Sequence, residues 1–200
     1  MYTSQIKIGN ITTSKREILD LIKAWVVISM AFAIMQNGGF GVSMIFLFIF
    51  IISAITAGLG FLLHEFVHKI VAQRYGCFAE FRSFDQMLIL TVILSFFGFI
   101  FAAPGAVFIT GNVGRRRNGI ISAAGPATNI MLAVMFLILI FFFRGSEILH
   151  IGFTINTWLA LFNMIPFGNF DGEKILRWSK TVYISMVIIA SSFMLIQAFL

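Results

Sequence analysis

Residues 42–63 form a run of 22 residues without a charged side chain. As an α-helix this run would be about 33 Å long, enough to cross the hydrocarbon core of a bilayer. Further apolar stretches lie at residues 24–35, 87–110, 119–143, 149–167 and 181–200. The chain is 60% hydrophobic and only 11% charged, whereas soluble domains carry about 25% charged residues. An ordinary water-soluble domain is therefore excluded.

The positions of Lys and Arg decide between six crossings and five. If all six stretches cross and the N-terminus is cytoplasmic, eight of these residues fall inside and six outside. If residues 87–110 enter and leave on the same side, thirteen fall inside and only Arg144 stays outside, as the positive-inside rule favours. We therefore predict an all-α polytopic membrane protein of about five to six transmembrane helices, with a cytoplasmic N-terminus.

The stretch 87–110 divides into two parts. Residues 87–97 would form a helix of roughly 17 Å, which is too short to cross. Residues 99–109 carry Pro104 and Gly105 near their centre, flanked by β-branched and aromatic residues, and Pro-Gly suits the middle of a type II turn. This pattern predicts a re-entrant element that ends in a β-hairpin, and the alternative is a Pro-kinked sixth helix that crosses fully.

The helix that begins with residues 42–63 continues into His64, Glu65 and His68. Two imidazoles four residues apart lie about 40° apart on one helix face, so both can reach one Zn²⁺. Glu65 points about 100° away from His64 around the helix axis. It is therefore suited to accept a proton from metal-bound water, as in H-E-x-x-H sites. His150 falls on the far side of the membrane in the five-crossing topology, so a third ligand should be a carboxylate, and that topology brings Asp171 to the same side as His64.

Simpler interpretations exist for the same residues. His64 and His68 would then be interfacial residues at the end of a span, and Glu65 would form an ion pair with Lys69 at i+4. Ionisable groups at the end of a long apolar helix are energetically costly, however, and this favours a functional role.

Three motifs resemble those of the site-2 protease family of intramembrane zinc metalloproteases. They are H-E-F-V-H at 64–68, G-P-A-T-N at 125–129, and N-M-I-P-F-G-N-F-D-G at 163–172. The resemblance implies that Asp171 is the third zinc ligand and that Asn163 contributes to substrate or oxyanion binding. It also implies a re-entrant β-hairpin between the first two motifs.

The second motif supplies Gly125, Pro126 and Asn129, which we expect to be structural residues beside the site. We expect a cytoplasmic N-terminal segment at 1–23 and one membrane-embedded metalloprotease domain at 24–200, without a PDZ or CBS domain. The resemblance implies one Zn²⁺ per chain, a cytoplasmic-side active site, membrane-spanning protein substrates and a lipid environment. The net charge of +6 reflects orientation rather than nucleic-acid binding. The alternatives are a metal transporter or sensor, and a catalytically silent membrane scaffold.

Overall fold

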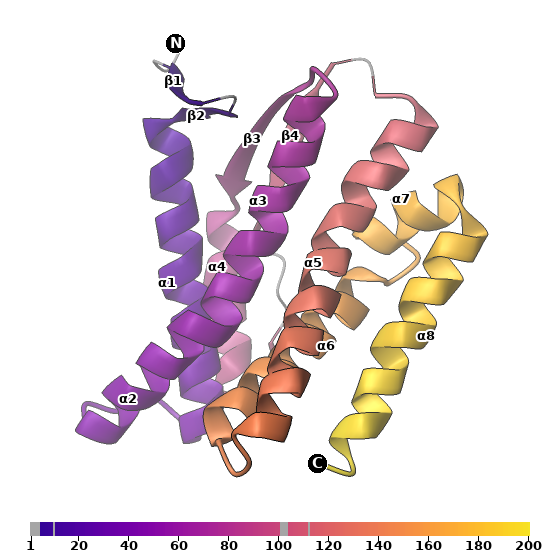
Figure 1. Cartoon of the computed structure of the whole chain (residues 1–200). Coiled ribbons are helices and arrows are strands. Elements are labelled where there is room, and N and C mark those ends of the chain that lie inside the picture. The colour runs from indigo at the N-terminus through magenta and orange to yellow at the C-terminus, as the bar shows by residue number, and fades with distance from the viewer. Residues whose placement is uncertain (1–4, 10, 101–103, 112) are drawn as a thin grey trace.

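The computed structural model describes residues 5–9, 11–100, 104–111 and 113–200, and it is mostly helical (Figure 1). Within these residues, four helical stretches are long and apolar enough to span a membrane: Lys15–Asn37, Met44–Arg74, Arg115–Phe142 and Lys180–Gln197. The predicted fold class, a mostly helical chain with several membrane-length apolar helices, is confirmed. The elements in chain order are β1 Gln5–Ile8, β2 Ile11–Ser14, α1 Lys15–Asn37, α2 Met44–Ser53, η1 Ala54–Gly58, α3 Leu59–Arg74, β3 Phe78–Ser83, α4 Asp85–Ser95, β4 Gly105–Thr110, α5 Arg115–Phe142, α6 Glu147–Asn163, α7 Asp171–Trp178 and α8 Lys180–Gln197.

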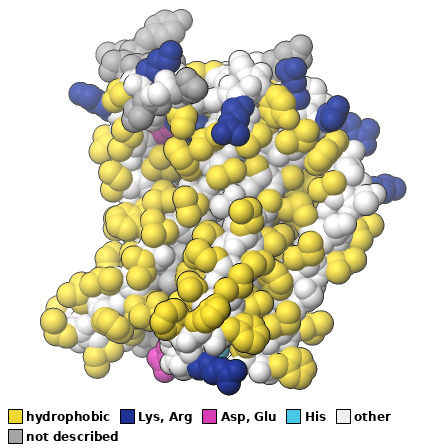
Figure 2. Space-filling view, in the orientation of Figure 1, with side chains coloured by type: hydrophobic (Ala, Val, Ile, Leu, Met, Phe, Trp, Pro, Cys, Tyr) yellow, Lys and Arg dark blue, Asp and Glu magenta, His cyan; other side chains and the backbone are white. Residues whose placement is uncertain are grey.

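The surface is apolar along the helices and basic at one end. Figure 2 shows hydrophobic side chains over the length of the bundle, while most of the visible Lys and Arg side chains gather at the end that holds β1, β2 and the start of α5. Arg144 follows α5 at its opposite end. The side of the predicted topology that is rich in Lys and Arg and the side that holds only Arg144 are therefore opposite ends of the folded chain.

The helix that carries the two histidines is longer than the apolar run and is interrupted once. It extends from Met44 to Arg74, with the π-helical turn η1 between α2 and α3. A π-turn leaves a carbonyl without its usual helical partner, and such turns occur often near functional sites. Here the carbonyl of Ala54 accepts the backbone N–H of Leu59 and, over 3.0 Å, the indole N–H of Trp25, so α1 adds a hydrogen bond to the turn.

The chain between α3 and α5 enters and returns at the same end of the bundle (Figure 1). The helix in this stretch, α4, has only 11 residues, so a continuous sixth crossing over residues 87–110 is not formed. β4 pairs antiparallel with β3, with Ser83 opposite Gly105 and Phe78 opposite Thr110. The re-entrant topology thus holds. The strand that pairs with β4 is β3, which precedes α4 in the chain.

The predicted type II turn at Pro104-Gly105 is wrong. A type II turn needs a positive φ at its second central residue, and Gly105 is not among the glycines with positive φ. Gly105 instead begins β4, where a Cβ would collide with the carbonyl oxygen of Arg82 and the ring of Phe81. Residues 101–103 of the predicted hairpin lie outside the described part of the chain.

An apolar core joins α1 to the elements that surround the histidines. Ile28 of α1 packs in one cluster with Phe61 of α3, Phe81 of β3, Leu88 of α4 and Leu159 of α6. Because this cluster includes residues of α3, β3 and α4, it fixes the re-entrant element against the histidine helix.

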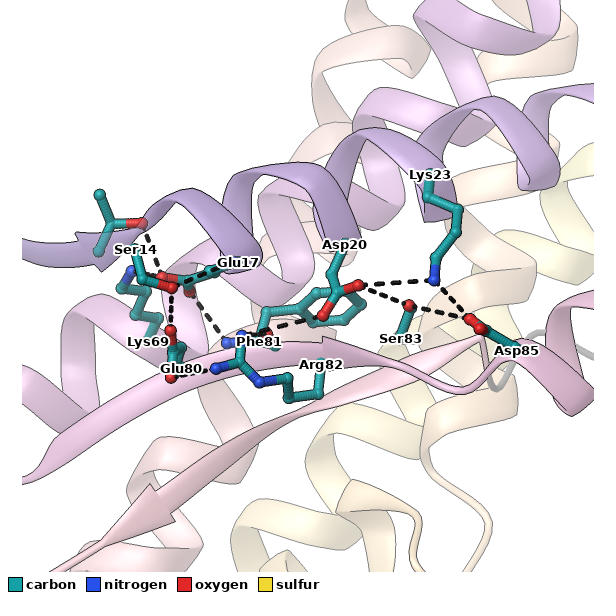
Figure 3. Close-up of polar contacts among 11 residues, drawn as sticks. Ser14, Glu17, Asp20, Lys23, Lys69, Glu80, Phe81, Arg82, Ser83 and Asp85 are labelled. Carbon is teal, nitrogen blue, oxygen red and sulfur yellow. Dashed lines mark hydrogen bonds and ion pairs between the residues drawn. The ribbon is translucent and has the colours of Figure 1, made fainter. Parts of the chain in front are cut away.

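Charged residues form a second link between α1 and β3, and Figure 3 shows them in one row. The Glu17 carboxylate is fully buried; it accepts from Lys69 Nζ over 2.5 Å and from the Phe81 backbone N–H over 2.9 Å. Farther along, Lys23 Nζ lies 2.5 Å from an Asp85 carboxylate oxygen. Lys69 is therefore the partner of Glu17, and the i+4 ion pair with Glu65, which the simpler interpretation requires, is not formed.

α1 begins at Lys15, inside the stretch assigned to the N-terminal segment. Its N-cap is Ser14, whose hydroxyl accepts from the backbone N–H of Glu17, a bond that satisfies one of the unpaired donors of the first turn. Charged residues therefore occupy the first turns of α1 ahead of its apolar part, so hydropathy alone places the start of this helix too late.

Candidate metal centre

The turn of α3 that follows the apolar run carries His64, Glu65 and His68, and all three side chains are buried. The two imidazole rings stand nearly perpendicular, at 80°, with their Nε2 atoms 3.0 Å apart. The helical i, i+4 spacing thus directs both Nε2 atoms to one point, as the sequence predicts.

Asp171 reaches the same point from a segment more than 100 residues away. Its Oδ2 lies 3.2 Å from His64 Nε2 and 3.0 Å from His68 Nε2. Asp171 is the first residue of α7, and the next residue, Gly172, packs so tightly on the backbone of Met164 that a Cβ would not fit. The loop between α6 and α7 therefore folds back closely and delivers the carboxylate to the histidines.

The outer nitrogens of both rings have acceptors. His64 Nδ1 lies 2.6 Å from Asn129 Oδ1, and His68 Nδ1 lies 2.7 Å from the backbone carbonyl of Ile121. Both acceptors belong to α5. This arrangement, in which the ring nitrogen away from the centre is hydrogen-bonded, is the usual way in which proteins orient metal-binding histidines.

The donor set fits a divalent zinc ion. Two imidazole nitrogens and one carboxylate oxygen lie within 4.8 Å of one another, and catalytic zinc sites are commonly built from two His and one carboxylate. Burial alone would raise the pKa of Asp171, but the imidazoles of His68 and His64 outweigh this effect and hold its pKa well below the usual range. The carboxylate is therefore in the ionised form that metals bind.

Gly125 of α5 leaves a space at the centre of this group. A Cβ at this position would lie 2.5 Å from His64 Nε2 and 2.6 Å from His68 Cε1, which is close to the 2.0–2.1 Å at which zinc binds nitrogen. The absence of a side chain at Gly125 thus leaves room for one ion beside the two imidazoles. Pro126 is buried beside it within the same continuous helix.

A cavity of about 410 Å³ opens beside the three ligand atoms. Its wall includes Glu65, Asn163 of α6 and Lys174 of α7, together with residues of α4 and β4. The Asn163 amide donates to the Leu159 carbonyl of its own helix over 3.0 Å, and Lys174 Nζ lies 3.9 Å from Asp171 Oδ1. The structure thus places Asn163 at the cavity and adds Lys174, three residues beyond Asp171, which the sequence analysis did not single out.

One edge of β4 faces this cavity. The backbone N–H of Phe84 donates to the Pro104 carbonyl. The main-chain groups at position 104 therefore point toward β3. Because the ladder alternates along an antiparallel pair, the main-chain groups of Gly105, Val107 and Ile109 point away from β3. Val107 and Glu65 accordingly line the same cavity.

These features define a class: a helical multi-pass membrane protein with a buried His-His-Asp group that fits one metal ion. A protein of Methanocaldococcus jannaschii named "Putative zinc metalloprotease" is 43% identical to this chain over 176 residues, which cover 85% of this chain and 88% of that protein. The chain therefore belongs to the family of that archaeal protein. No family model matches the chain, and no solved structure matches it.

Proposed function

We propose that this chain is an intramembrane zinc endopeptidase of the site-2 protease type that hydrolyses peptide bonds of membrane-spanning proteins. The observation that carries the proposal is the meeting of His64, His68 and Asp171 at one point, with Glu65 at the same cavity. The name of the archaeal relative supports zinc and proteolysis. The apolar helices around the site support a substrate that lies in the membrane.

In this proposal His64, His68 and Asp171 hold one Zn²⁺ per chain. Bound zinc supplies a Lewis acid that polarises a carbonyl and lowers the pKa of water to about 7. Glu65 accepts the proton of the attacking water as its oxygen adds to the scissile carbonyl carbon. Glu65 then passes that proton to the amine nitrogen as the C–N bond breaks.

Asn163 and the free edge of β4 are proposed to hold the substrate. The Asn163 side chain lines the cavity, from which it can donate a hydrogen bond to the developing oxyanion. A helical substrate hides its carbonyls in backbone hydrogen bonds, so it must unwind before cleavage. The main-chain groups of Gly105 and Val107 can pair with the unwound segment as an added strand.

We further propose that the N-terminus and the site face the cytoplasm. The support is the distribution of Lys and Arg, with thirteen residues on the N-terminal side of the predicted topology and Arg144 on the other. The positive-inside rule places the richer side in the cytoplasm.

The test compares wild type with Glu65→Gln, with Glu147→Gln as the matched control because Glu147 lies in the first turn of α6, away from the cavity lining. Zinc content is measured on the purified proteins, and cleavage is measured in detergent with single-span model proteins that carry helix-destabilising residues. We expect equal zinc in all three proteins and cleavage by wild type and Glu147→Gln, abolished by a zinc chelator. Full activity of Glu65→Gln, or zinc-loaded wild type without cleavage of any model substrate, would contradict the proposal.

A further inference from the structure

Lys174 is the only Lys or Arg among the described residues that line the cavity, and the acidic residues of the same wall are Glu65 and Asp171. Lys174 lies on α7, three residues after Asp171, and residues three apart share one face of a helix. Its side chain is 38% exposed. Lys174 therefore forms part of the cavity wall while its ammonium group stays accessible to a molecule that enters.

The carboxylates closest to Lys174 in the chain are engaged by other groups. The one ion pair that Lys174 forms among the described residues joins its Nζ to Asp171 Oδ1 over 3.9 Å, which is longer than a hydrogen bond. The other oxygen, Asp171 Oδ2, lies 3.0–3.2 Å from the two imidazoles. Glu173 pairs with Arg177 over 2.5 Å. Lys174 thus differs from Lys69, which lies 2.5 Å from its own carboxylate partner.

The charges of the cavity leave Lys174 in surplus once the proposed metal is bound. The two positive charges of Zn²⁺ match the two negative charges of Asp171 and Glu65, the acidic residues of the described wall. The ammonium of Lys174 then has no counter-charge within the cavity. A charged group that is partly removed from water is stabilised when an opposite charge approaches it. The cavity is therefore suited to a ligand that brings one carboxylate with it.

An amide side chain lies close to Lys174 in the same wall. Gly119 of α5 packs so tightly on the Trp178 side chain of α7 that a Cβ would not fit, and Trp178 is one helical turn beyond Lys174. Asn118, the residue before Gly119, also lines the cavity. The contact between α5 and α7 thus brings an ammonium group and an amide to one part of the wall, and both can donate hydrogen bonds to a carboxylate.

We propose that Lys174 is a specificity-determining residue whose ammonium pairs with a carboxylate of the substrate close to the cleaved bond. The carboxylate belongs to an Asp or Glu side chain or to the free C-terminus of a shortened membrane segment, and its chemistry at Lys174 is the same in both cases. The proposal rests on the proposed function, and it adds a preference among membrane-spanning substrates that the metal centre alone does not supply.

The test uses pairs of single-span model proteins that differ only in Asp or Asn at one position, which is moved along the cleaved segment. A further pair ends within this segment and carries a free α-carboxylate or an amide, which separates the two sources. Binding to zinc-loaded Glu65→Gln is measured by fluorescence anisotropy, and cleavage by zinc-loaded wild type is measured as kcat/KM. We expect the acidic member of at least one pair to bind and be cleaved about 10-fold better, as one charge-assisted hydrogen bond predicts.

The same pairs are then compared in variants of Lys174, made in wild type for cleavage and in Glu65→Gln for binding. In Lys174→Met we expect the preference for the acidic member to disappear with the zinc content unchanged, and in Lys174→Glu we expect the neutral member to become the better one. Lys180→Met is the matched control and should keep the preference, because Lys180 is an exposed residue at the start of α8 that does not line the cavity.

The absence of a preference in every pair would overturn the proposal, and this comparison needs no variant of Lys174 to fold. An unchanged preference in Lys174→Met would overturn it as well, because the carboxylate would then bind the metal or another group. Loss of zinc from Lys174→Met would show instead that Lys174 supports Asp171. Cleavage without a preference leaves the proposed peptidase intact, whereas a preference in binding without cleavage removes the peptidase and keeps the role of Lys174.

Discussion

Gly125→Ala should abolish zinc binding while leaving the helix that carries it intact. The added Cβ would lie 2.5 Å from His64 Nε2 and nearer still to His68 Nε2, whereas a carbon normally keeps about 3.5 Å from a non-bonded atom. The methyl group would therefore occupy the ion's place and push the two ligating nitrogens apart by about 1 Å. Alanine otherwise favours a helix over glycine by about 0.5–1 kcal/mol, so the fold should be preserved.

Loss of one hydrogen-bonding partner of a metal ligand weakens binding about 10–100-fold. Displacing both ligating nitrogens should exceed that range, so we expect a loss of more than about 100-fold, or about 2.8 kcal/mol. The assay is zinc competition with a chelator, with circular dichroism to confirm helicity. Gly114→Ala is the matched control, because its Cβ would meet nothing within 4 Å at the N-cap of the same helix. Zinc affinity of Gly125→Ala within about threefold of wild type would refute this reasoning.

Two further predictions concern other contacts. Asp171→Ala should lower the zinc content of the purified protein, because it removes the carboxylate that lies 3.0 Å from one imidazole; unchanged stoichiometry would remove Asp171 from the ligand set. Glu17→Gln should destabilise the fold by about 3–5 kcal/mol, because it leaves the buried Lys69 ammonium without a counter-charge; adding Lys69→Met should restore most of this loss in denaturation experiments in mixed micelles.

The sequence predicts the parts of the site that depend on regular spacing. His64 and His68 share a helix face because a helix has a fixed number of residues per turn. The charge asymmetry brought Asp171 to the same side without reference to its chemistry, and the structure has the three side chains together. Only the family motif predicts the loop that leads to Asp171, and the sequence does not show the close packing of Gly172 that holds this loop.

Contacts between distant segments were missed. The strand Phe78–Ser83 alternates buried Ala79 and Phe81 with charged residues, a period of two that signals a strand, but its partner beyond α4 is not encoded locally. Lys69 illustrates the same limit, because the carboxylate four residues before it, that of Glu65, is not its partner, and tertiary packing supplies Glu17 instead.

Asn156 was also missed, although a signal existed. It is an amide within a mainly apolar helix, and a polar residue inside a membrane protein marks a hydrogen-bonding partner or a function. Its partner Asn129 was identified only as part of a motif. What the sequence could not show is that the Asn129 amide donates to Asn156 Oδ1 over 3.1 Å while its own oxygen lies 2.6 Å from His64 Nδ1.

Zinc-edge X-ray absorption on the purified wild-type protein tests the convergence of the two distant segments most directly. We expect one zinc per chain with two imidazole nitrogens at about 2.0–2.1 Å and oxygen donors for the rest, without sulfur. We expect one imidazole signal to disappear in His64→Ala and the oxygen contribution to change in Asp171→Ala. A zinc ion bound by a single imidazole or by sulfur, or a purified protein that takes up no zinc, would contradict the account.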